Sequence, residues 1–354
     1  MKKTIGLIAQ PWRKEKVEEF KQVIEKASEL GFTELWSGID KDTVNEVRSI
    51  ASLTNKLGFY YFVDINPAVL ENLGASPSDL SIFKKLGVQG VRADYGFDLD
   101  QLATMANNDL GLKVELNASV FPVDDLDDLL KMVRNTENLL ASHDFYPWLH
   151  TGISLESAIN KSREFHNRGM PVAIFASLKN GERTTVEHLR YLDIGVSANI
   201  LLNTRVIDRI LIGDPLPPYE EMRKVADVLK HTKIRVKPYP GITEEEAKVF
   251  GRDFYDVRVK ETTVGLTAGG DNKIIPHNIV RRVRGSVTVI NNNPNYIQVW
   301  VFKDDAPPDP RFNVIGEVID EDMEIIDRIA ERTRGTFRSL SREDLPPVTF
   351  EAVQ

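Results

Sequence analysis

The sequence has no cysteine, no long hydrophobic run and no excess of basic residues, and each absence excludes a class of protein. Without cysteine the chain cannot form disulfides, thiolate nucleophiles, cysteine-ligated zinc sites or iron–sulfur clusters. The longest apolar run, from Leu57 to Val63, is far shorter than the ~20 residues that a membrane-spanning helix needs. With 45 Lys+Arg against 53 Asp+Glu, the formal net charge is −8, which argues against nucleic acid as a partner.

Motifs for a bound metal or cofactor are also missing. The histidines show no HxH or HExxH spacing, so we expect no metal site. No glycine-rich loop follows the first apolar run, which argues against a Rossmann dinucleotide domain, and we expect no cofactor. The first residues, MKKTIGLIAQPW, carry only a short apolar run and no small-residue cleavage site, so they predict a first strand and a cytoplasmic protein.

What the sequence does contain, up to about residue 230, is an alternation of short β-branched runs with longer amphipathic segments. Val17–Leu30 and Ser154–Gly169 show helical periodicity, the latter with Ser154 as its N-cap. Eight such β/α units in about 230 residues fit a TIM (β/α)8 barrel better than a doubly wound sheet. The predicted strands are Thr4–Ala9, Glu34–Gly38, Tyr60–Asp64, Gly90–Asp94, Leu112–Ser119, Leu139–His143, Pro171–Phe175 and Arg209–Gly213.

The pattern changes after the proline-rich stretch KPYPG at 237–241. Period two replaces period 3.6 in Tyr255–Thr262, Arg284–Asn291 and Tyr296–Phe302, and NNNPN at 291–295 predicts a turn. We therefore expect a barrel domain over 1–235 and a smaller antiparallel β domain over 236–354. Asp320–Ile329 is predicted to be the one substantial helix of this second domain.

In a TIM barrel the active site lies at the C-terminal ends of the strands. Polar residues there include Asp64 on the third predicted strand, Arg92 and Asp94 on the fourth, and Glu115 and Asn117 on the fifth. Because side chains alternate along a strand, we expect all five to face the barrel mouth. The alternative is a set of buried salt bridges, but one arginine cannot neutralise three carboxylates, and unpaired buried charge is costly.

The segment after the sixth predicted strand, SHDFYPWLHTGIS, places His143, Tyr146 and Thr151 just past a strand end. Aromatic rings beside polar groups suit the binding of a sugar, so these three are candidate substrate contacts. The alternative is a packed loop in which Tyr146 is part of the core and His143 hydrogen-bonds a backbone carbonyl.

Two basic clusters are candidates for holding an anion. Lys179 and Arg183 lie in SLKNGERTT after the seventh strand, where barrels commonly bind phosphate. Arg281, Arg282 and Arg284 lie in the β domain and could reach a phosphate at the barrel mouth. A solvated loop and a solvated strand edge are the respective alternatives.

Several runs in fixed order carry a resemblance. DINPAVLENLG, LGVQGVRADYGF, KVELNAS, HDFYPWLHTGIS and ILIGDP, followed by RVRGSVTVINNNPNY and DPRFNVIGEVIDEDMEIID, resemble the bacterial 6-phospho-N-acetylmuramidase family over most of the chain. The resemblance implies a TIM barrel with a C-terminal cyclophilin-like β domain. It also implies hydrolysis of the glycosidic bond of a phosphorylated disaccharide, MurNAc 6-phosphate–GlcNAc, in the cytoplasm during cell-wall recycling.

For such a glycosidase we expect Asp94 and Glu115 to be the acid and its partner, with Asp64 the next candidate. Neighbouring strands lie about 4.8 Å apart, so Asp94 with Glu115 would suit a retaining pair and Asp64 with Glu115 an inverting one, and the sequence leaves both open. Two other functions stay open: a non-catalytic phosphosugar-binding protein, and a TIM-barrel lyase or isomerase for sugar phosphates. We also expect the β domain to cover the barrel mouth, in the same chain or in a homodimer.

Overall fold

The computed structural model describes residues 3–329 and 345–354, which form two compact units. The first unit comprises 3–197 and 206–226, and the second comprises 198–205, 227–329 and 345–354. The boundary predicted after residue 235 falls within strand β9 (Thr232–Pro238).

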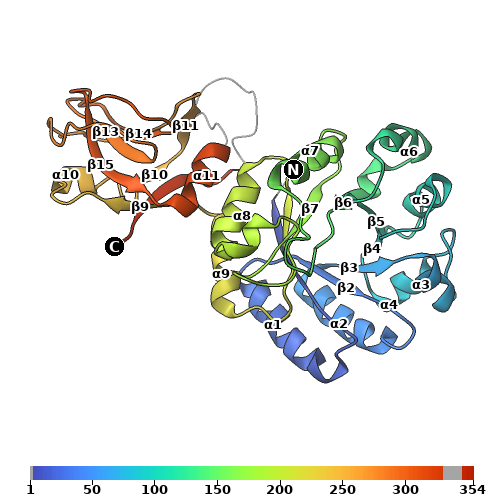
Figure 1. The fold of residues 1–354 in the computed structure, drawn as a ribbon. Helices are drawn as coiled ribbons and strands as arrows, with labels where there is room; N and C mark the ends of the chain where they lie inside the picture. The colour runs from blue at the N-terminus through green and yellow to red at the C-terminus, as the bar shows by residue number, and fades with distance from the viewer. Residues whose placement is uncertain (1–2, 330–344) are drawn as a thin grey trace. The chain divides into compact units, whose positions relative to one another are not determined.

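The first unit is a closed barrel of eight parallel strands, which confirms the predicted TIM-type fold (Figure 1). Each strand pairs with the next, and β8 pairs with β1 to close the ring. The strands are β1 (Thr4–Ile8), β2 (Glu34–Gly38), β3 (Tyr60–Ile65), β4 (Gly90–Ala93), β5 (Lys113–Asn117), β6 (Leu139–Ser142), β7 (Val172–Ala176) and β8 (Arg209–Ile212). The helices are α1 (Val17–Glu29), α2 (Val44–Leu57), α3 (Pro67–Asn72), α4 (Ser81–Leu86), α5 (Leu99–Ala106), α6 (Leu126–Met132), α7 (Leu155–His166), α8 (Ile194–Asn203) and α9 (Tyr219–Val228).

Polar residues fix the starts of two helices that follow strand-end loops. The Ser154 hydroxyl accepts a hydrogen bond from the backbone N–H of Ser157 at 3.1 Å, which makes it the N-cap of α7 as predicted. Asp98 accepts from the backbone N–H of Gln101 at 2.8 Å, and the Gln101 side chain accepts from the Asp98 N–H at 3.1 Å. This capping box fixes the point at which the loop after β4 becomes α5.

Large aromatic rings beside small residues fill the barrel interior. Trp36 and Phe62 stack with ring centroids 5.2 Å apart, and Phe175 meets Trp36 edge-on at 6.0 Å. Gly90 faces Phe62 on the next strand, and a Cβ there would lie 2.5 Å from the Phe62 ring, so a larger residue would clash. Phe62 precedes Asp64 by two positions on the same face of β3, so this aromatic layer forms the floor of the barrel mouth.

The second unit is built on one mixed sheet with the order β10-β16-β9-β15-β13-β14-β12-β11. Its pairs are antiparallel, as predicted, except that β16 runs parallel to β9. Its helices are α10 (Glu244–Ala247) and α11 (Met323–Arg328), which follows the 3-10 turn Asp320–Asp322. The other strands are β10 (Asp253–Phe254), β11 (Asp256–Val259), β12 (Thr263–Gly269), β13 (Ser286–Ile290), β14 (Tyr296–Phe302), β15 (Phe312–Val318) and β16 (Val348–Ala352).

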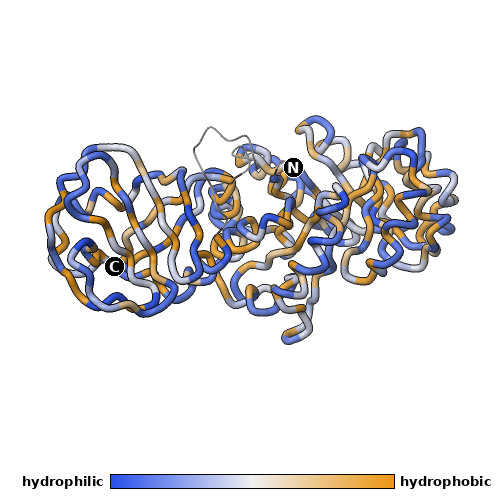
Figure 2. Tube along the Cα trace, turned by 90° about the horizontal axis from the view of Figure 1, so that it is seen from above, coloured by the Kyte–Doolittle hydropathy of each residue, from blue (hydrophilic) through white to orange (hydrophobic). Residues whose placement is uncertain are grey.

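The hydropathy of the chain follows the elements in both units. Figure 2 shows hydrophobic and hydrophilic residues alternating along the helices and strands, as expected for elements with one buried face. Within the described residues, no helix combines the length and the apolar character required to cross a membrane.

Candidate functional site

A group of charged side chains meets at the C-terminal ends of β3, β4 and β6. Asp64 pairs in register with Arg92, and Asp94 follows β4 on the same face as Arg92. Asp144 comes two positions after Ser142, the last residue of β6, and so points to the same interior. We call Asp64, Arg92, Asp94 and Asp144 the mouth cluster.

Arg92 is the centre of the mouth cluster. Its Nη1 donates to Asp94 Oδ1 at 2.7 Å and to Asp64 Oδ1 at 3.4 Å, and its Nη2 donates to Asp144 Oδ1. The Nε atom donates to Ser142 Oγ at 2.8 Å, which fixes the plane of the guanidinium. The Arg92 side chain is 5% exposed, so the three carboxylates lie between it and the opening of the barrel.

Asn117, at the end of β5, joins two of these carboxylates. Its amide nitrogen donates to Asp94 Oδ1 at 3.0 Å and to the two oxygens of Asp144 at 3.0 and 3.2 Å. The Asn117 carbonyl oxygen accepts from the backbone N–H of Ser119 at 3.0 Å, so the orientation of the amide is fixed by the chain. The structure thus brings the predicted residues Asp64, Arg92, Asp94 and Asn117 together.

The mouth cluster has more negative than positive charge, and its acids reach solvent. The side chains of Asp64, Asp94 and Asp144 are 43%, 33% and 30% exposed. Desolvation raises the pKa of Asp64 to about 6, because Arg92 only partly offsets it and the neighbouring Asp94 and Asp144 raise it further. Asp64 can therefore hold and release a proton near neutral pH, which is what a general acid requires.

Glu115 does not lie at the mouth, contrary to the prediction. Its side chain is fully buried, and its Oε1 accepts from Arg209 Nη1 at 3.0 Å. Arg209 also binds Glu34 on the other side, with Nε 3.0 Å from Oε2, and its guanidinium lies 5.4 Å from the centroid of the Phe62 ring. We call Glu34, Glu115 and Arg209 the interior cluster; this is the buried salt bridge of the alternative interpretation, made with Arg209 instead of Arg92.

Burial has a strong effect on the acid of the interior cluster. It raises the pKa of Glu115 to about 7, although Arg209 opposes this rise through its charge and its hydrogen bond. The second carboxyl oxygen, Oε2, has no hydrogen-bond partner among the residues that the structure describes. Glu115 is thus a buried titratable group that no ligand at the mouth can touch in this structure.

His143 is also placed away from the mouth. The side chain is fully buried, with Nε2 2.9 Å from Ser162 Oγ and Nδ1 3.4 Å from Ser119 Oγ. Burial lowers its pKa to about 3, so the imidazole is neutral at physiological pH. His143 therefore supports the β6 end from outside the barrel interior instead of contacting a substrate.

The loop after β6, which contains Tyr146 and Thr151, is held by a buried arginine. Arg190 donates to the carbonyls of Tyr146 at 2.9 Å and Trp148 at 3.2 Å, and also to those of Gly181 and Glu182 in the loop after β7. Glu187 binds Arg190, and this bond holds the Glu187 pKa well below its usual range. The Thr151 hydroxyl donates to the Trp148 carbonyl at 2.6 Å, so it has a local partner in a turn.

The loop after β7 is held by the carboxylate of Asp214, which follows β8. The Asp214 carboxylate accepts hydrogen bonds from the backbone N–H groups of Leu178 at 2.8 Å, Glu182 at 2.9 Å and Arg183 at 3.3 Å. These amides would otherwise be the natural phosphate contacts of this loop. The Arg183 guanidinium lies 5.5 Å from the centroid of the Phe145 ring, and Lys179, in the same loop, is exposed.

The three β-domain arginines that were predicted to bind an anion all have partners within that domain. Arg282 is buried, donates to the Pro307 carbonyl and lies 4.7 Å from the centroid of the Phe302 ring, so it is a packing residue. Arg281 pairs with Asp305 at 2.9 Å, and Arg284 pairs with Asp327 at 2.6 Å. These pairs leave Arg281 and Arg284 on the surface as ordinary ion pairs, without a common anion site.

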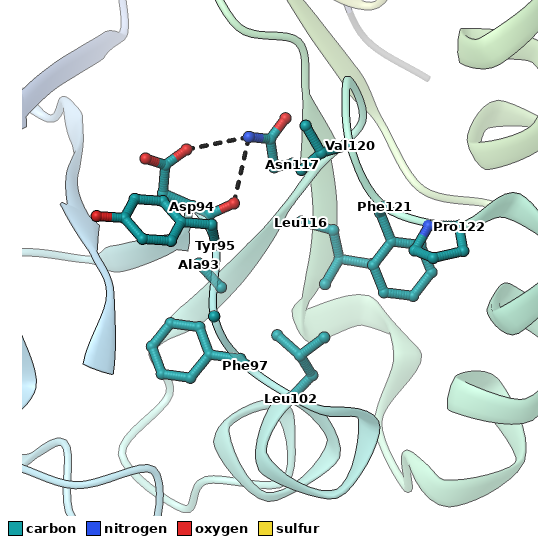
Figure 3. A pocket seen from close by; sticks show the side chains of 11 residues that line it. Ala93, Asp94, Tyr95, Phe97, Leu102, Leu116, Asn117, Val120, Phe121 and Pro122 are labelled. Atoms are coloured by element: carbon teal, nitrogen blue, oxygen red, sulfur yellow. Dashed lines mark hydrogen bonds between the residues drawn. The ribbon is translucent and has the colours of Figure 1, made fainter. Parts of the chain in front are cut away.

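A small cavity of about 190 Å³ adjoins the mouth cluster, between the loops that follow β4 and β5 (Figure 3). Asp94 and Asn117 form one end of it. Hydrophobic side chains form the remainder, and Tyr95 and Val120, which are 63% and 60% exposed, stand at its rim. The hydrophobic lining residues are Ala93, Phe97, Leu102, Leu116, Phe121 and Pro122.

Sequence reasoning missed the role of Asp144 and the partner of Glu115. Asp144 lies two positions after Ser142 of β6, as Asp94 lies two positions after Arg92 of β4, and this parallel spacing is the signal that could have identified it. Arg209 lies at the start of β8 and contacts Glu115 across the barrel, and no local pattern in the sequence indicates that contact.

Comparisons with known proteins identify the family and agree with the fold. Models of the N-terminal and C-terminal parts of 6-phospho-N-acetylmuramidase match residues 11–227 and 232–338. A crystal structure of an uncharacterized B. cereus protein is 25% identical, with a TM-score of 0.79 over 100% of both chains. A conserved Enterococcus faecalis protein with an unknown function is 21% identical and shares the fold, with a TM-score of 0.69 over 99% of this chain and 96% of that one.

No curated protein is significantly similar to this sequence. The two family models nevertheless account for nearly the whole chain, from the first barrel loop into the second unit. The chain belongs to the 6-phospho-N-acetylmuramidase family, whose name describes a glycoside hydrolase.

Proposed function

We propose that this protein hydrolyses the glycosidic bond of a 6-phosphorylated amino-sugar disaccharide, MurNAc 6-phosphate–GlcNAc, in the cytoplasm during cell-wall recycling. The observation that carries the proposal is the mouth cluster: three partly exposed carboxylates around one arginine at the end of a TIM barrel where catalytic residues lie. Membership of the family supports the phosphorylated amino sugar as the substrate class.

Asp64 is proposed as the general acid. Its carboxyl is the most exposed of the three, and its raised pKa of about 6 leaves a useful fraction protonated near neutral pH. A protonated carboxyl can donate to the glycosidic oxygen as the bond to the anomeric carbon breaks. Glu115 has a raised pKa as well, but its burial excludes it from this role.

Asp94 is proposed as the ionised partner that faces the anomeric carbon. Asp64 Oδ1 and Asp94 Oδ1 bind the same nitrogen, Arg92 Nη1, at 3.4 and 2.7 Å. Because both oxygens bind one nitrogen, the two carboxyl groups lie close together, and we propose the shorter separation that is typical of a retaining pair. In the proposed retaining reaction, Asp94 is the nucleophile and water later attacks the same carbon.

Arg92, Asn117 and Asp144 are proposed as positioning residues. Arg92 and Asn117 both donate to Asp94 Oδ1, so they fix the orientation of this carboxylate and leave its Oδ2 to the substrate. Asp144 binds the second arm of Arg92 and thereby prevents its rotation. For the phosphate we propose the side chains of Arg183 and Lys179, because Asp214 occupies the backbone amides of their loop.

The test compares the hydrolysis of synthetic MurNAc 6-phosphate–GlcNAc with that of the unphosphorylated disaccharide. The release of the reducing sugar measures the rate of each reaction. We expect the phosphorylated substrate to be preferred, and Arg183→Ala to reduce that preference by about 10-fold or more, the scale of one hydrogen bond to a charged group. A double variant, Arg281→Ala with Arg284→Ala, is the matched control and should keep the preference.

Three results would contradict the proposal. Binding of the disaccharide without cleavage would identify a sugar-binding protein instead. Conversion of a free sugar phosphate would identify a lyase or isomerase. Loss of the preference in the double variant, with Arg183→Ala unaffected, would move the phosphate contact to the β domain.

A further inference from the structure

Trp12, in the loop after β1, is an exposed aromatic residue that lies against the end of a barrel strand. The residue is 53% exposed. A Cβ on Gly38, the last residue of β2, would lie 3.3 Å from the Cζ3 atom of the Trp12 ring. Gly38 follows Trp36 by two positions, so it belongs to the interior face on which Trp36 stacks with Phe62. The Trp12 ring therefore lies on the interior side of the β2 end, at the barrel mouth.

This position is next to the mouth cluster. Gly38 pairs in register with Asp64, and Asp64 pairs in register with Arg92. Neighbouring strands lie about 4.8 Å apart, so the Trp12 ring lies one strand away from Asp64, on the side opposite to Asp94. Around the mouth from β4 to β2, the order of the groups is Asp94, Asp64 and then the Trp12 ring.

The backbone fixes the position of the ring before a ligand arrives. The Arg13 N–H donates to the Gln10 carbonyl at 2.9 Å and closes a turn, in which Pro11 restricts the backbone. Gln10 is 1% exposed, so the turn begins at a buried residue. Lys14 Nζ donates to the Asp42 carbonyl at 2.6 Å, which joins the loop after β1 to the loop after β2. The tryptophan within this turn is thus held in place at low entropic cost to a ligand.

An exposed indole face at this position suits one class of chemical group. A pyranose ring presents carbon-bound hydrogens on its face and hydroxyls at its edge, so it can lie flat on the indole while its hydroxyls stay in water. A phosphate is hydrated on every side and gains no comparable contact from an indole face. The Trp12 ring therefore fits a sugar ring better than it fits an anion.

We propose that Trp12 is a stacking platform for the leaving-group sugar, which is the ring beyond the glycosidic oxygen. The inference rests on the proposed function for the roles of Asp94 and Asp64. In that function Asp94 faces the anomeric carbon and Asp64 faces the glycosidic oxygen, so the second ring lies beyond Asp64, where the Trp12 ring is. Trp12 is thus a specificity residue that favours a leaving group with a sugar ring, and it takes no part in breaking the bond.

Two substrates that share the phosphorylated sugar separate the platform from the chemistry. One is MurNAc 6-phosphate–GlcNAc, and the other is the glycosyl fluoride of MurNAc 6-phosphate with the same anomeric configuration, whose leaving group has no ring. Trp12→Ala should lower kcat/KM for the disaccharide by about 10-fold or more, the scale of one hydrophobic contact, and that for the fluoride by less than about twofold. Trp12→Phe keeps an aromatic face and should restore most of the loss.

Tyr60→Ala is the matched control. Tyr60 is 51% exposed, close to the exposure of Trp12, and it is the first residue of β3, so it lies at the end of the barrel opposite to the mouth. Removal of its ring should leave the ratio of the two kcat/KM values unchanged. Circular dichroism checks that each variant is folded.

Binding without turnover distinguishes a failure of the platform from a failure of the proposed function. In the Asp94→Asn variant, which should leave the substrate intact, calorimetry compares the disaccharide with MurNAc 6-phosphate alone. The disaccharide should bind about 10-fold more tightly, and the addition of Trp12→Ala should remove this difference.

The outcomes for the platform and for the proposed function are distinct. Equal or absent binding of the two compounds, or a preference for the disaccharide that survives Trp12→Ala, overturns the platform. An equal loss of kcat/KM on both substrates in Trp12→Ala overturns it too. Failure of the wild type to cleave the disaccharide, with a preference in binding that depends on Trp12, overturns the proposed function and leaves the platform supported.

Discussion

The barrel contains two clusters, each built from one arginine and several carboxylates, in different surroundings. In each, one arginine is bound by more than one carboxylate: Arg209 by Glu34 and Glu115, and Arg92 by three aspartates. The carboxylates of the interior cluster are at most 7% exposed, whereas those of the mouth cluster are 30–43% exposed. Residue type and charge pairing alone therefore do not identify an active site.

The two clusters differ in whether their carboxylates can be reached from solvent. In the interior cluster the aromatic rings of Trp36 and Phe62 lie close to the Arg209 guanidinium, so no substrate atom can reach the carboxylates. In the mouth cluster each aspartate keeps one side toward solvent. We therefore expect the interior cluster to affect stability only, and the mouth cluster to act on a ligand. The experiments below separate these two roles.

The largest expected difference is in turnover. Asp64→Asn should lower kcat by about 10²–10⁴, because an amide cannot donate the proton that a general acid supplies. Glu115→Gln, the matched change in the interior cluster, should keep kcat within about tenfold. Steady-state kinetics on the phosphorylated disaccharide measure both, with circular dichroism as the check on folding. A larger loss in Glu115→Gln than in Asp64→Asn would reverse our assignment.

The next difference is in stability. Arg209→Met should lower the free energy of unfolding by about 3–5 kcal/mol, since it leaves Glu34 and Glu115 buried without their partner. Arg92→Met should have a smaller effect on stability, because its three aspartates can turn to water. Urea unfolding of both variants gives the comparison. Equal losses would mean that exposure does not distinguish the clusters.

The pH dependence of stability should belong to the interior cluster. The folded-state pKa of Glu115 is about 7, above its ordinary value near 4.5, so the folded protein binds this proton more tightly than the unfolded chain does. The stabilisation is complete below pH 4.5 and is lost as the pH rises through 7, by up to about 3 kcal/mol. Relative to wild type, Glu115→Gln should therefore become more stable as the pH rises from 4.5 to 7. Unfolding free energies of the wild type and of Glu115→Gln that change with pH in the same way would refute this.

The smallest expected effect is on the pH profile of the rate. Asp64 has a pKa of about 6, and it must be protonated to act as the acid. The value of kcat/KM should then fall about tenfold per pH unit above pH 6. Asp64→Asn should lose this limb, while Glu115→Gln should keep it. A wild-type profile that is flat from pH 6 to pH 8 would exclude Asp64 as the acid.

The fold was largely predictable from the sequence, because short strand-like runs alternate with amphipathic helical patterns along the barrel. The eight barrel strands begin and end within two residues of the predicted runs. The parallel pairing of β16 with β9 was not predictable, since β9 starts the second sheet and β16 ends it, with no local signal of the direction of their pairing.

The sequence predicts which side chains of the site face the barrel interior, but it does not predict how deep each one lies along the barrel axis. Alternation along a strand indicates that Glu115 and Asn117 face the interior, and both do. It does not indicate how far along the barrel axis each lies, and two positions on β5 separate a fully enclosed acid from an amide that contacts Asp94 and Asp144. The contact between Glu115 and Arg209 joins strands on different sides of the barrel, so only the closed sheet reveals it.

The buried Arg190 has a consequence for the kinetics of binding. It bridges the loops after β6 and β7 through four backbone carbonyls, so both loops are ordered before any ligand arrives. A sugar that docks against them incurs no entropic penalty for folding a lid, and association needs no slow closing step on this side of the barrel. Stopped-flow traces should accordingly show one binding phase whose rate rises linearly with ligand concentration, without the plateau that a conformational step imposes.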